Sequence, residues 1–533
     1  MTRNPAAVQR PGKSGDRVDR SAATTRPVAR RGDPARQTLR QRAGRVLWTN
    51  WTGTSTVPSR ALYPHQWSWD SAFIAIGLRH LSPLRAQVEL ETLLAAQWGD
   101  GRVPHIVFND AVPPDAYFPG PGFWRSATAG RRAGAPAAVR TSGIVQPPVH
   151  ALAAWLVHRA DPGLSRARSF LDRVRPRLDA WHRYLLDARN AGGAGLAAVL
   201  HPWEQGMDNS PCWDGPLSRV EPAGADDFRR ADLAHGAPED RPTDLDYGRY
   251  VRLAAEYRDA GYADTGGADT GGADTGGADR GGFSVEDPAF NALLIASEYA
   301  LAAIEAETAG PAVPPPEARR ARAEALTRTL VERLWDPGEE LFLCRDLRAG
   351  QAGQLIAERG ATGLVPLLLP ALPRDIAAAL VRTACGPHFG LGGAALLVPS
   401  YDLTGPAFDP HRYWRGPAWF NVNWLLWKGL RQHGEDAPAD RLRTSMLDVA
   451  GASGFAEYVD PRTGRGRGAR GFGWTAALTL DLLHDGHDGH DGRDGHDGRD
   501  GRDGRDGRDG RDGRDAHDAH DARGGLSEGE VWA

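Results

Sequence analysis

Four segments of the chain combine tryptophan or tyrosine with carboxylates, histidine or glycine. They are Tyr63–Asp70, Gly101–Phe108 together with Gly143–Pro148, His201–Asp214, and Tyr413–Trp424 together with Gly454–Asp460. Aromatic rings pack on the C–H faces of a sugar, whereas carboxylates bind hydroxyl groups and transfer protons. This combination indicates carbohydrate chemistry, and the cleavage of a glycosidic bond in particular.

Glycosidic cleavage needs two carboxyl groups in different protonation states. One stays protonated near neutral pH and protonates the leaving oxygen, which requires an apolar or acidic neighbourhood. The other stays ionised and either activates a water molecule or attacks the anomeric carbon. The third segment offers three candidates for the acid, Glu204, Asp208 and Asp214. Their spacing does not choose among them.

The candidate for the ionised carboxylate is Glu457, which lies among aromatic residues in the fourth segment. A glycine-rich run, Gly464–Gly471, follows it, and glycine lets the backbone approach a ligand closely. Asp409 and Asp460 are its rivals. The sequence of this segment leaves all three open.

The elements that carry these segments are expected to be helices. Ser82-Pro83 and Asp287-Pro288 each place an N-cap residue and a proline before apolar residues spaced at i, i+3 and i+4. Further amphipathic stretches cover 148–159, 166–189, 246–259, 316–334, 373–384, 419–432, 437–450 and 474–484. Alternating β-branched runs are nearly absent, so we predict an all-α fold. A closed ring of helix pairs is favoured over a solenoid, because no 34- or 40-residue repeat is visible.

The two ends and one internal segment are not expected to belong to the folded domain. Residues 1–36 form an Arg- and Pro-rich tail, and residues 485–533 repeat Asp, Gly, Arg and His, so we predict that both are disordered. Residues 263–282 are four Gly-rich pentads, which we expect to bury nothing and to form an expanded loop. The folded domain is therefore expected to span residues 37–484.

Composition excludes several classes of protein. The chain has 64 basic and 68 acidic residues, so a generally nucleic-acid-binding surface is not expected. The three cysteines and the histidines show no metal-ligand spacing, and we expect neither a metal nor a cofactor. No apolar run approaches the about 18 residues of a membrane span, and no secretion signal is evident. We therefore expect a cytoplasmic protein without a membrane partner.

Four ordered strings carry a resemblance to a known family. YPHQWSWDSAF, HPWEQGMDNSPCWD, YWRGPAWFNVNW and GFAEYVDPRTG resemble the bacterial mannosylglycerate and glucosylglycerate hydrolases of glycoside hydrolase family 63. The likeness spans about residues 35 to 484. It implies an (α/α)6 toroid, that is, a closed ring of six helical hairpins. It also implies hydrolysis with inversion at the anomeric carbon.

The resemblance also implies roles for individual residues. The family's general acid falls on Asp208 and its general base on Glu457. The sugar-side residues fall on Tyr63, Trp67, Trp69, Asp70, Gln146, Trp203, Gly206 and Trp419. The residues around the glycerate carboxylate fall on Arg241 and Tyr247, with Tyr117, Tyr413 and Trp414 alongside. The implied substrate is a small anionic glycoside, and the family allows a homo-oligomer.

Simpler interpretations compete with these roles. Trp67 and Trp69 could belong to the core instead of a sugar platform, and Arg241 could form a surface ion pair in its charge-rich segment. Nine of the 17 tryptophans fall in or beside the motif segments, which we interpret as the mark of a sugar site. Family members usually carry serine where this chain has Gly473, so one hydroxyl group near the mouth of the site is expected to be missing.

Two other functions remain as alternatives. The first is a family 63-type α-glucosidase acting on a small trehalose- or glucan-like oligosaccharide. The second is a sugar-binding protein without catalytic activity. The sequence leaves the choice between glucose and mannose open, because one or two contacts read the hydroxyl group that distinguishes them.

Overall fold

Six helical elements form a closed ring in the computed structural model, in which each contacts the next and the last contacts the first. In ring order they are α2 (Ser68–Leu78), α6 (His150–Ala160), α12 (Pro288–Glu307), η6 (Ala361–Leu368), α15 (Phe420–Gln432) and α17 (Gly473–Asp485). All eleven residues of α2 are buried, as expected for a helix that is apolar on every side. The structure describes residues 34–234, 238–264, 282–308 and 314–485.

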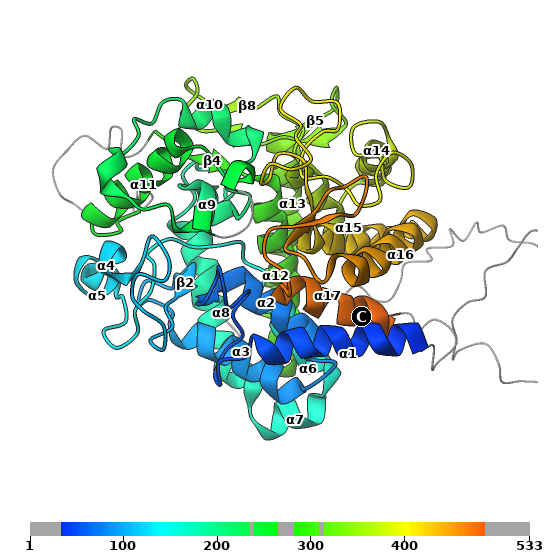
Figure 1. Cartoon of the computed structure of the whole chain (residues 1–533), viewed down its shortest axis with the longest axis horizontal. Coiled ribbons are helices and arrows are strands. Elements are labelled where there is room, and N and C mark those ends of the chain that lie inside the picture. Colours follow the sequence, from blue (N-terminus) through cyan, green and yellow to red (C-terminus); the bar gives the residue numbers. More distant parts are fainter. Residues whose placement is uncertain (1–33, 235–237, 265–281, 309–313, 486–533) are drawn as a thin grey trace, which may run out of the picture.

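A second set of helices covers the ring from outside. The contacts are α1 (Pro34–Thr49) with α17, α3 (Pro83–Ala95) with α2, α8 (Phe170–Asp187) with α12, α13 (Pro316–Leu334) with α12, α14 (Arg374–Cys385) with η6, and α16 (Asp436–Ser453) with α15. In Figure 1, α1 lies alongside α17, although the two come from opposite ends of the chain. The prediction of a helix-rich fold is confirmed.

The two predicted helix starts are present. The Ser82 hydroxyl accepts a hydrogen bond from the Arg85 N–H at 3.3 Å before α3, and Asp287 accepts one from the Phe290 N–H at 2.7 Å before α12. Asp287 also accepts a hydrogen bond from the Thr362 hydroxyl of η6 at 2.7 Å. The same side chain therefore caps α12 and holds it against its neighbour in the ring.

Helix α12 contains two buried charged residues in a mostly apolar sequence. It is the one described helix that is long and apolar enough to cross a membrane, and 83% of the window that meets this test is buried inside the structure. Glu298 and Glu305 interrupt the run, which is why no such span was expected from the sequence. Both pair with buried Arg319 of α13, at 2.9 and 2.7 Å, so their charges are neutralised inside the protein.

Short antiparallel strands, each of two residues, tie the connectors between helices together. The pairs are β1 (Gln66–Trp67) with β2 (Ile106–Val107), and β5 (Trp335–Asp336) with β6 (Leu341–Phe342). The larger sheets have the orders β3 (Ala198–Val199), β4 (Val285–Glu286), β7 (Arg345–Asp346), β8 (Gln354–Leu355), and β11 (Gly466–Arg467), β10 (Tyr458–Val459), β9 (Ala418–Trp419). In the last sheet Tyr458 lies opposite both Trp419 and Arg467.

The remaining elements are short and lie mostly in connectors, and in Figure 1 several of them gather in the upper part of the view. The α-helices are α4 (Pro121–Trp124), α5 (Ser126–Ala129), α7 (Pro162–Ala167), α9 (Pro202–Gln205), α10 (Asp214–Leu217) and the longer α11 (Asp244–Asp259). The 3-10 turns are η1 (Arg131–Ala133), η2 (Pro211–Trp213), η3 (Ala225–Asp227), η4 (Ala231–Ala234) and η5 (Pro238–Asp240).

The predicted boundaries need three corrections. Helix α1 begins at Pro34, so the last three residues of the predicted 1–36 tail are helical. Helix α17 ends at Asp485, so the first residue of the predicted 485–533 tail is helical as well. Asp264, in the first pentad, has a side chain only 7% exposed that pairs with Arg102 and Arg189, so the expectation that residues 263–282 bury nothing is wrong at this position. The rest of the predicted tails and residues 265–281 lie outside the described residues.

Candidate active site

A narrow cavity of about 80 Å³ lies at the N-terminal ends of α2 and α17. Its wall includes thirteen of the residues selected from the sequence: Tyr63, Trp67, Trp69, Asp70, Tyr117, Gln146, Trp203, Gly206, Asp208, Arg241, Tyr247, Tyr413 and Glu457. They come from connectors far apart in the sequence. The ring of helices therefore brings the four chemically rich segments to one place.

Aromatic rings form one side of this cavity. Pairing of β1 with β2 sets Trp67 opposite Ile106. The Trp67 ring meets Tyr63 and Tyr117 edge to face, with centroids 5.3 and 5.1 Å apart. Such packing fixes the ring planes, so the aromatic wall is formed before any ligand binds.

The backbone at Trp69, two residues after Trp67, is also held by residues of the cavity wall. The Gln146 side chain accepts a hydrogen bond from the Trp69 N–H at 3.2 Å. Gly206 has a φ of +85°, and a Cβ there would come within 2.6 Å of the Trp69 ring. Only glycine allows the chain to pass this close to the tryptophan.

The Glu457 carboxylate is held by three groups. Its Oε1 accepts a hydrogen bond from the Tyr63 hydroxyl at 2.8 Å, and its Oε2 accepts one from the Ala469 N–H at 2.9 Å. The Arg241 guanidinium lies 3.7 Å from Oε2. A Cβ at Gly468, which has a φ of +64°, would come within 2.4 Å of Oε2. The predicted close approach of the glycine-rich run to the site therefore occurs at Gly468.

Asp208 lies in a different environment within the same cavity. Burial raises its pKa to about 7, with Asp232 and Glu457 adding to the increase and Arg241 opposing it. The Tyr250 hydroxyl donates a hydrogen bond to the Asp208 carbonyl at 2.7 Å, which holds the loop in place. Asp208 is therefore suited to stay protonated near neutral pH.

Arg241 is buried in the cavity and is not a surface residue. It is 6% exposed, and its guanidinium stacks 4.6 Å above the Tyr413 ring. It donates a hydrogen bond to the Tyr63 hydroxyl at 3.0 Å. Asp70, in the first turn of α2, is 3% exposed, and burial followed by the charge of Glu457 raises its pKa well above its usual range.

The rival carboxylates lie outside the cavity wall. Glu204 is fully buried and pairs with Arg189 at 2.7 Å, while Asp214 is half exposed and pairs with Arg415. Asp409 and Asp460 accept hydrogen bonds from nearby backbone N–H groups in turns. Of the six candidates, the structure thus brings only Asp208 and Glu457 into one cavity.

Trp414 and Trp419 require a correction. They do not line the cavity but stack on each other behind Tyr413, with ring centroids 3.7 Å apart and planes 4° from parallel. Each is 1% exposed. Trp414 has a φ of +59°, and its ring packs on Trp419.

Six wall residues were not selected from the sequence: Pro58, His105, Asp232, Pro242, Phe472 and Trp474. Asp232 pairs with Arg230 at 2.8 Å, and it lies in a charged stretch without an aromatic neighbour that could have marked it. Phe472 and Trp474 flank Gly473, whose absent hydroxyl was expected near the mouth. A Cβ at Gly473 would instead press on Ile74, so this position is not part of the wall.

No group of three or more His, Cys, Asp or Glu suited to hold a metal ion occurs among the residues that the structure describes. The chemistry available in the cavity is that of carboxyl groups, tyrosines, one arginine and aromatic rings.

A ring of paired helices with two carboxyl groups in different environments at one aromatic cavity is the arrangement of a glycoside hydrolase. The chain belongs to the mannosylglycerate hydrolase MGH1-like glycoside hydrolase family, whose model matches residues 63–475.

Characterised relatives are similar over nearly their whole length. The chain is 40% identical over 458 residues to the mannosylglycerate hydrolase of Rubrobacter radiotolerans, covering 85% of this chain and 98% of that protein. It is 38% identical over 458 residues to the glucosylglycerate hydrolase of Mycolicibacterium hassiacum, covering 84% and 97%. The crystal structure of the family 63 mannosylglycerate hydrolase of Thermus thermophilus with Tris and D-glycerate has a TM-score of 0.70 at 39% identity, covering 83% and 99%.

Proposed function

We propose that this protein is an inverting α-glycosidase that hydrolyses mannosylglycerate or glucosylglycerate to the hexose and glycerate. One observation carries the proposal: a single cavity holds a carboxyl group whose pKa is raised to about 7, Asp208, and a carboxylate that accepts two hydrogen bonds, Glu457. Relatives that match over nearly their full length act on these two glycosides according to their names.

The two carboxyl groups divide the reaction between them. Asp208 donates its proton to the glycosidic oxygen while the bond from that oxygen to the anomeric carbon breaks. Glu457 takes a proton from a water molecule, whose oxygen forms the new bond to the anomeric carbon on the opposite face. An α-glycoside therefore gives the β-hexose first, and the released glycerate carries the proton from Asp208 on its 2-hydroxyl group.

Arg241 is the group we assign to the glycerate carboxylate. A guanidinium binds two carboxylate oxygens at once, and in a buried site this pairing is strong. Tyr247, Tyr117 and Tyr413 line the same cavity. A neutral oligosaccharide would leave this buried cation without a partner from the ligand, which disfavours a trehalose- or glucan-like substrate.

Sugar binding is assigned to Tyr63, Trp67, Trp69, Asp70, Gln146, Trp203 and Gly206. Trp203 is the wall tryptophan that is only partly buried, and its ring centroid lies 6.0 Å from that of Tyr247.

We also propose that residues 37–484, extended by the first turn of α1, form one (α/α)6 toroid. The closed ring of six elements with six covering helices supports this, as does the similarity to the Thermus enzyme. An anionic metabolite as substrate favours a cytoplasmic location, which cell fractionation tests. Light scattering of the purified protein tests the homo-oligomer that the family allows.

The direct test is incubation of the purified protein with each glycoside, with release of hexose and glycerate as the readout. Proton NMR during the first minutes identifies the anomer formed, and we expect the β form. If the α form appears first, the configuration is retained, and this would exclude the water-activating role of Glu457. No release of hexose from either glycoside would overturn the proposed function.

Matched variants test the two carboxyl groups. Asp208→Asn and Glu457→Gln are each expected to lower kcat by about 10²-fold or more, the contribution of a general acid or base. Asp214→Asn and Asp460→Asn change carboxylates of the same two segments that lie outside the cavity, and we expect them to keep activity. Full activity in Asp208→Asn or Glu457→Gln would contradict the role given to that residue.

A further inference from the structure

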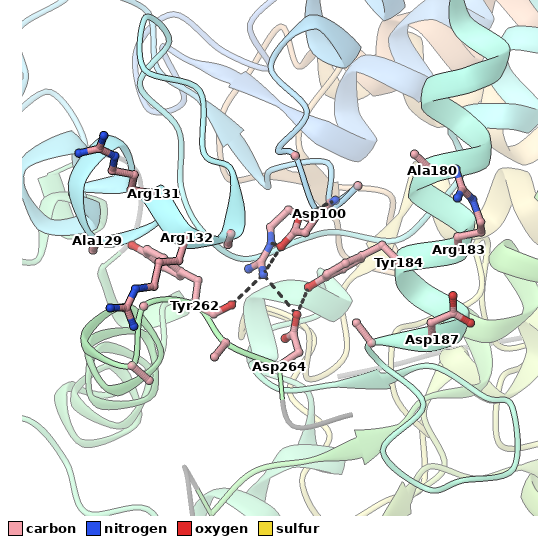
Figure 2. Close-up of a pocket in the computed structure, with 18 of the residues that line it drawn as sticks. Asp100, Ala129, Arg131, Arg132, Ala180, Arg183, Tyr184, Asp187, Tyr262 and Asp264 are labelled. Atoms are coloured by element: carbon pink, nitrogen blue, oxygen red, sulfur yellow. Dashed lines mark hydrogen bonds and ion pairs between the residues drawn. The ribbon is translucent and has the colours of Figure 1, made fainter. Parts of the chain in front are cut away.

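A second cavity, of about 940 Å³, shares no wall residue with the candidate active site. One part of its wall is a group of buried polar side chains from distant segments, namely Arg102, Tyr184, Tyr262 and Asp264. Figure 2 shows Tyr184 and Asp264 pointing toward each other, with Tyr262 and Asp100 nearby. Asp264 belongs to the first Gly-rich pentad, a segment whose pattern does not point to a structured site.

The Asp264 carboxylate is surrounded by two tyrosine hydroxyls and two guanidinium groups. Oδ1 accepts a hydrogen bond from the Tyr257 hydroxyl at 2.7 Å and forms an ion pair with Arg189, whose Nε lies 3.0 Å away and donates to the Tyr184 hydroxyl. Oδ2 receives the Tyr184 hydroxyl at 2.7 Å and a guanidinium nitrogen of Arg102 at 3.2 Å. Burial alone would raise the pKa of Asp264, but the two arginines outweigh it and hold the pKa below its usual value.

Arg189 connects Asp264 to the segment that carries the proposed acid. It binds Glu204 through two parallel hydrogen bonds of 2.7 and 2.8 Å, and both side chains are almost completely buried. Glu204 also accepts a hydrogen bond from the Leu200 N–H at 2.8 Å and one from the Val145 N–H at 3.4 Å. Val145 precedes Gln146, a residue of the active-site wall.

Glu204 is flanked by residues of the proposed site. Trp203 and Gly206 line the active-site cavity, and Asp208 follows four residues later. We call residues 201–208 the acid loop. Glu204 is the fully buried charged residue of this loop, so the orientation of its carboxylate determines the position of the loop.

We propose that Asp264 is a positioning residue for the acid loop, acting through Arg189 and Glu204. This inference rests on the proposed function, because it assigns the loop to proton donation by Asp208. Asp264 touches no part of the active-site wall, so it contributes geometry and takes no part in the chemical steps.

The groups around residue 264 require a carboxylate at this position. Each of its oxygens accepts one tyrosine hydroxyl and lies within 3.2 Å of one arginine nitrogen. An amide of the same shape would present N–H donors toward one of these arginines, and a buried donor facing a donor is costly. Arg102 would keep Asp100 at 2.7 Å, whereas Arg189 would lose the charge that lies 3.0 Å from its Nε and would turn, and Glu204 would turn with it.

The test compares two substrates in the Asp264→Asn variant. The first is the glycerate glycoside that the wild type cleaves, whose leaving group needs a proton. The second is the matching α-hexosyl fluoride, whose fluoride leaves without full protonation. A misplaced acid should lower kcat/KM for the glycoside about tenfold more than for the fluoride, within the range that general acids contribute.

Two control variants sharpen the comparison. Asp269→Asn changes the aspartate with the same sequence neighbours in the next pentad, and Asp259→Asn changes an exposed carboxylate at the same second cavity. Both are expected to keep the ratio of the two kcat/KM values. If Asp264→Asn does not fold, Tyr257→Phe removes one of the two tyrosine hydroxyls that bind Asp264 and should shift the ratio in the same direction.

The outcomes separate this inference from the proposed function. An equal loss on both substrates, or no loss on either, would overturn the positioning role while leaving the proposed function intact. A wild-type protein that hydrolyses neither substrate would overturn both. A selective loss on the glycoside, restricted to Asp264→Asn, supports the positioning role.

Discussion

The Tyr63 hydroxyl donates a hydrogen bond of 2.8 Å to the Glu457 carboxylate while it accepts one of 3.0 Å from Arg241. One hydroxyl group therefore connects the buried guanidinium of Arg241 to the Glu457 carboxylate. Because the Ala469 N–H binds the other oxygen of Glu457, this carboxylate is fixed in direction as well as in place. A group that orients an attacking water needs such a fixed direction.

Removing this hydroxyl should reduce catalysis strongly. We expect Tyr63→Phe to lower kcat/KM by roughly 10- to 100-fold, because a hydrogen bond to a charged group contributes about 1.5–3 kcal/mol. Steady-state kinetics on the glycerate glycoside measures the effect. Tyr401→Phe is the matched control, since the Tyr401 hydroxyl donates to Glu358 at 2.6 Å outside the cavity. A similar loss in the control would show that the effect is not specific to the site.

The rate should fall as the pH rises through neutrality. Burial raises the pKa of Asp208 to about 7, so this group is protonated and able to donate below that pH and ionised above it. We expect kcat/KM to decrease about tenfold per pH unit on the alkaline side. A pH profile from about 5 to about 9 measures this limb. A profile that stays flat into the alkaline range would contradict the acid role of Asp208.

The same raised pKa predicts a change in stability. A carboxyl group whose pKa is higher in the folded state stabilises the fold fully below its unfolded pKa, and this contribution is lost as the pH rises through about 7. Asn cannot ionise, so Asp208→Asn should raise Tm relative to the wild type by more at about pH 8 than at about pH 5. Thermal unfolding at both values tests this. Asp214→Asn, at a half-exposed carboxylate, should show no such trend.

The helices could be predicted because their signals are local. Ser82-Pro83 and Asp287-Pro288 act within one turn of the helix they begin, and the structure has both caps. The closing contact of the ring is different. Helices α2 and α17 are about 400 residues apart in sequence, and nothing in the apolar pattern of either helix indicates that the two pack together. Only the family resemblance indicated a ring of six hairpins.

Site residues were mostly predictable where a motif marks them, and much less so where packing alone decides. The family resemblance placed Trp419 on the sugar side and Trp414 near the glycerate carboxylate, yet the turn at Trp414 stacks them on each other inside the core. Asp232 reaches the cavity from a charged stretch with no distinguishing pattern. Asp264 lies in a low-complexity repeat, and its burial depends on nearby Tyr257 and on Arg102, Tyr184 and Arg189 from distant segments.

Gly206 offers a test of how closely the wall is packed. A Cβ at this position would come within 2.6 Å of the Trp69 ring, and the φ of +85° is strained for any other residue. We expect Gly206→Ala to lower both Tm and kcat/KM. Gly434→Ala is the matched control, because Gly434 has a φ of +74° with nothing within 4 Å of its Cβ. The control should lower Tm alone, and an equal loss of activity there would contradict the role of the Trp69 contact.

Arg241 should decide which aglycone the enzyme accepts. Because its guanidinium also contacts Tyr63 and lies near Glu457, a substitution affects the reaction with every substrate. The informative quantity is therefore the ratio of kcat/KM for the glycerate glycoside to that for the neutral glycerol glycoside. We expect Arg241→Ala to lower this ratio roughly 30-fold or more, which corresponds to about 2 kcal/mol for the loss of a buried charged partner. Arg415→Ala, at an arginine that pairs with Asp214 outside the cavity, should leave the ratio unchanged. An unchanged ratio in Arg241→Ala would show that another group binds the carboxylate and would reopen the case for a neutral oligosaccharide substrate.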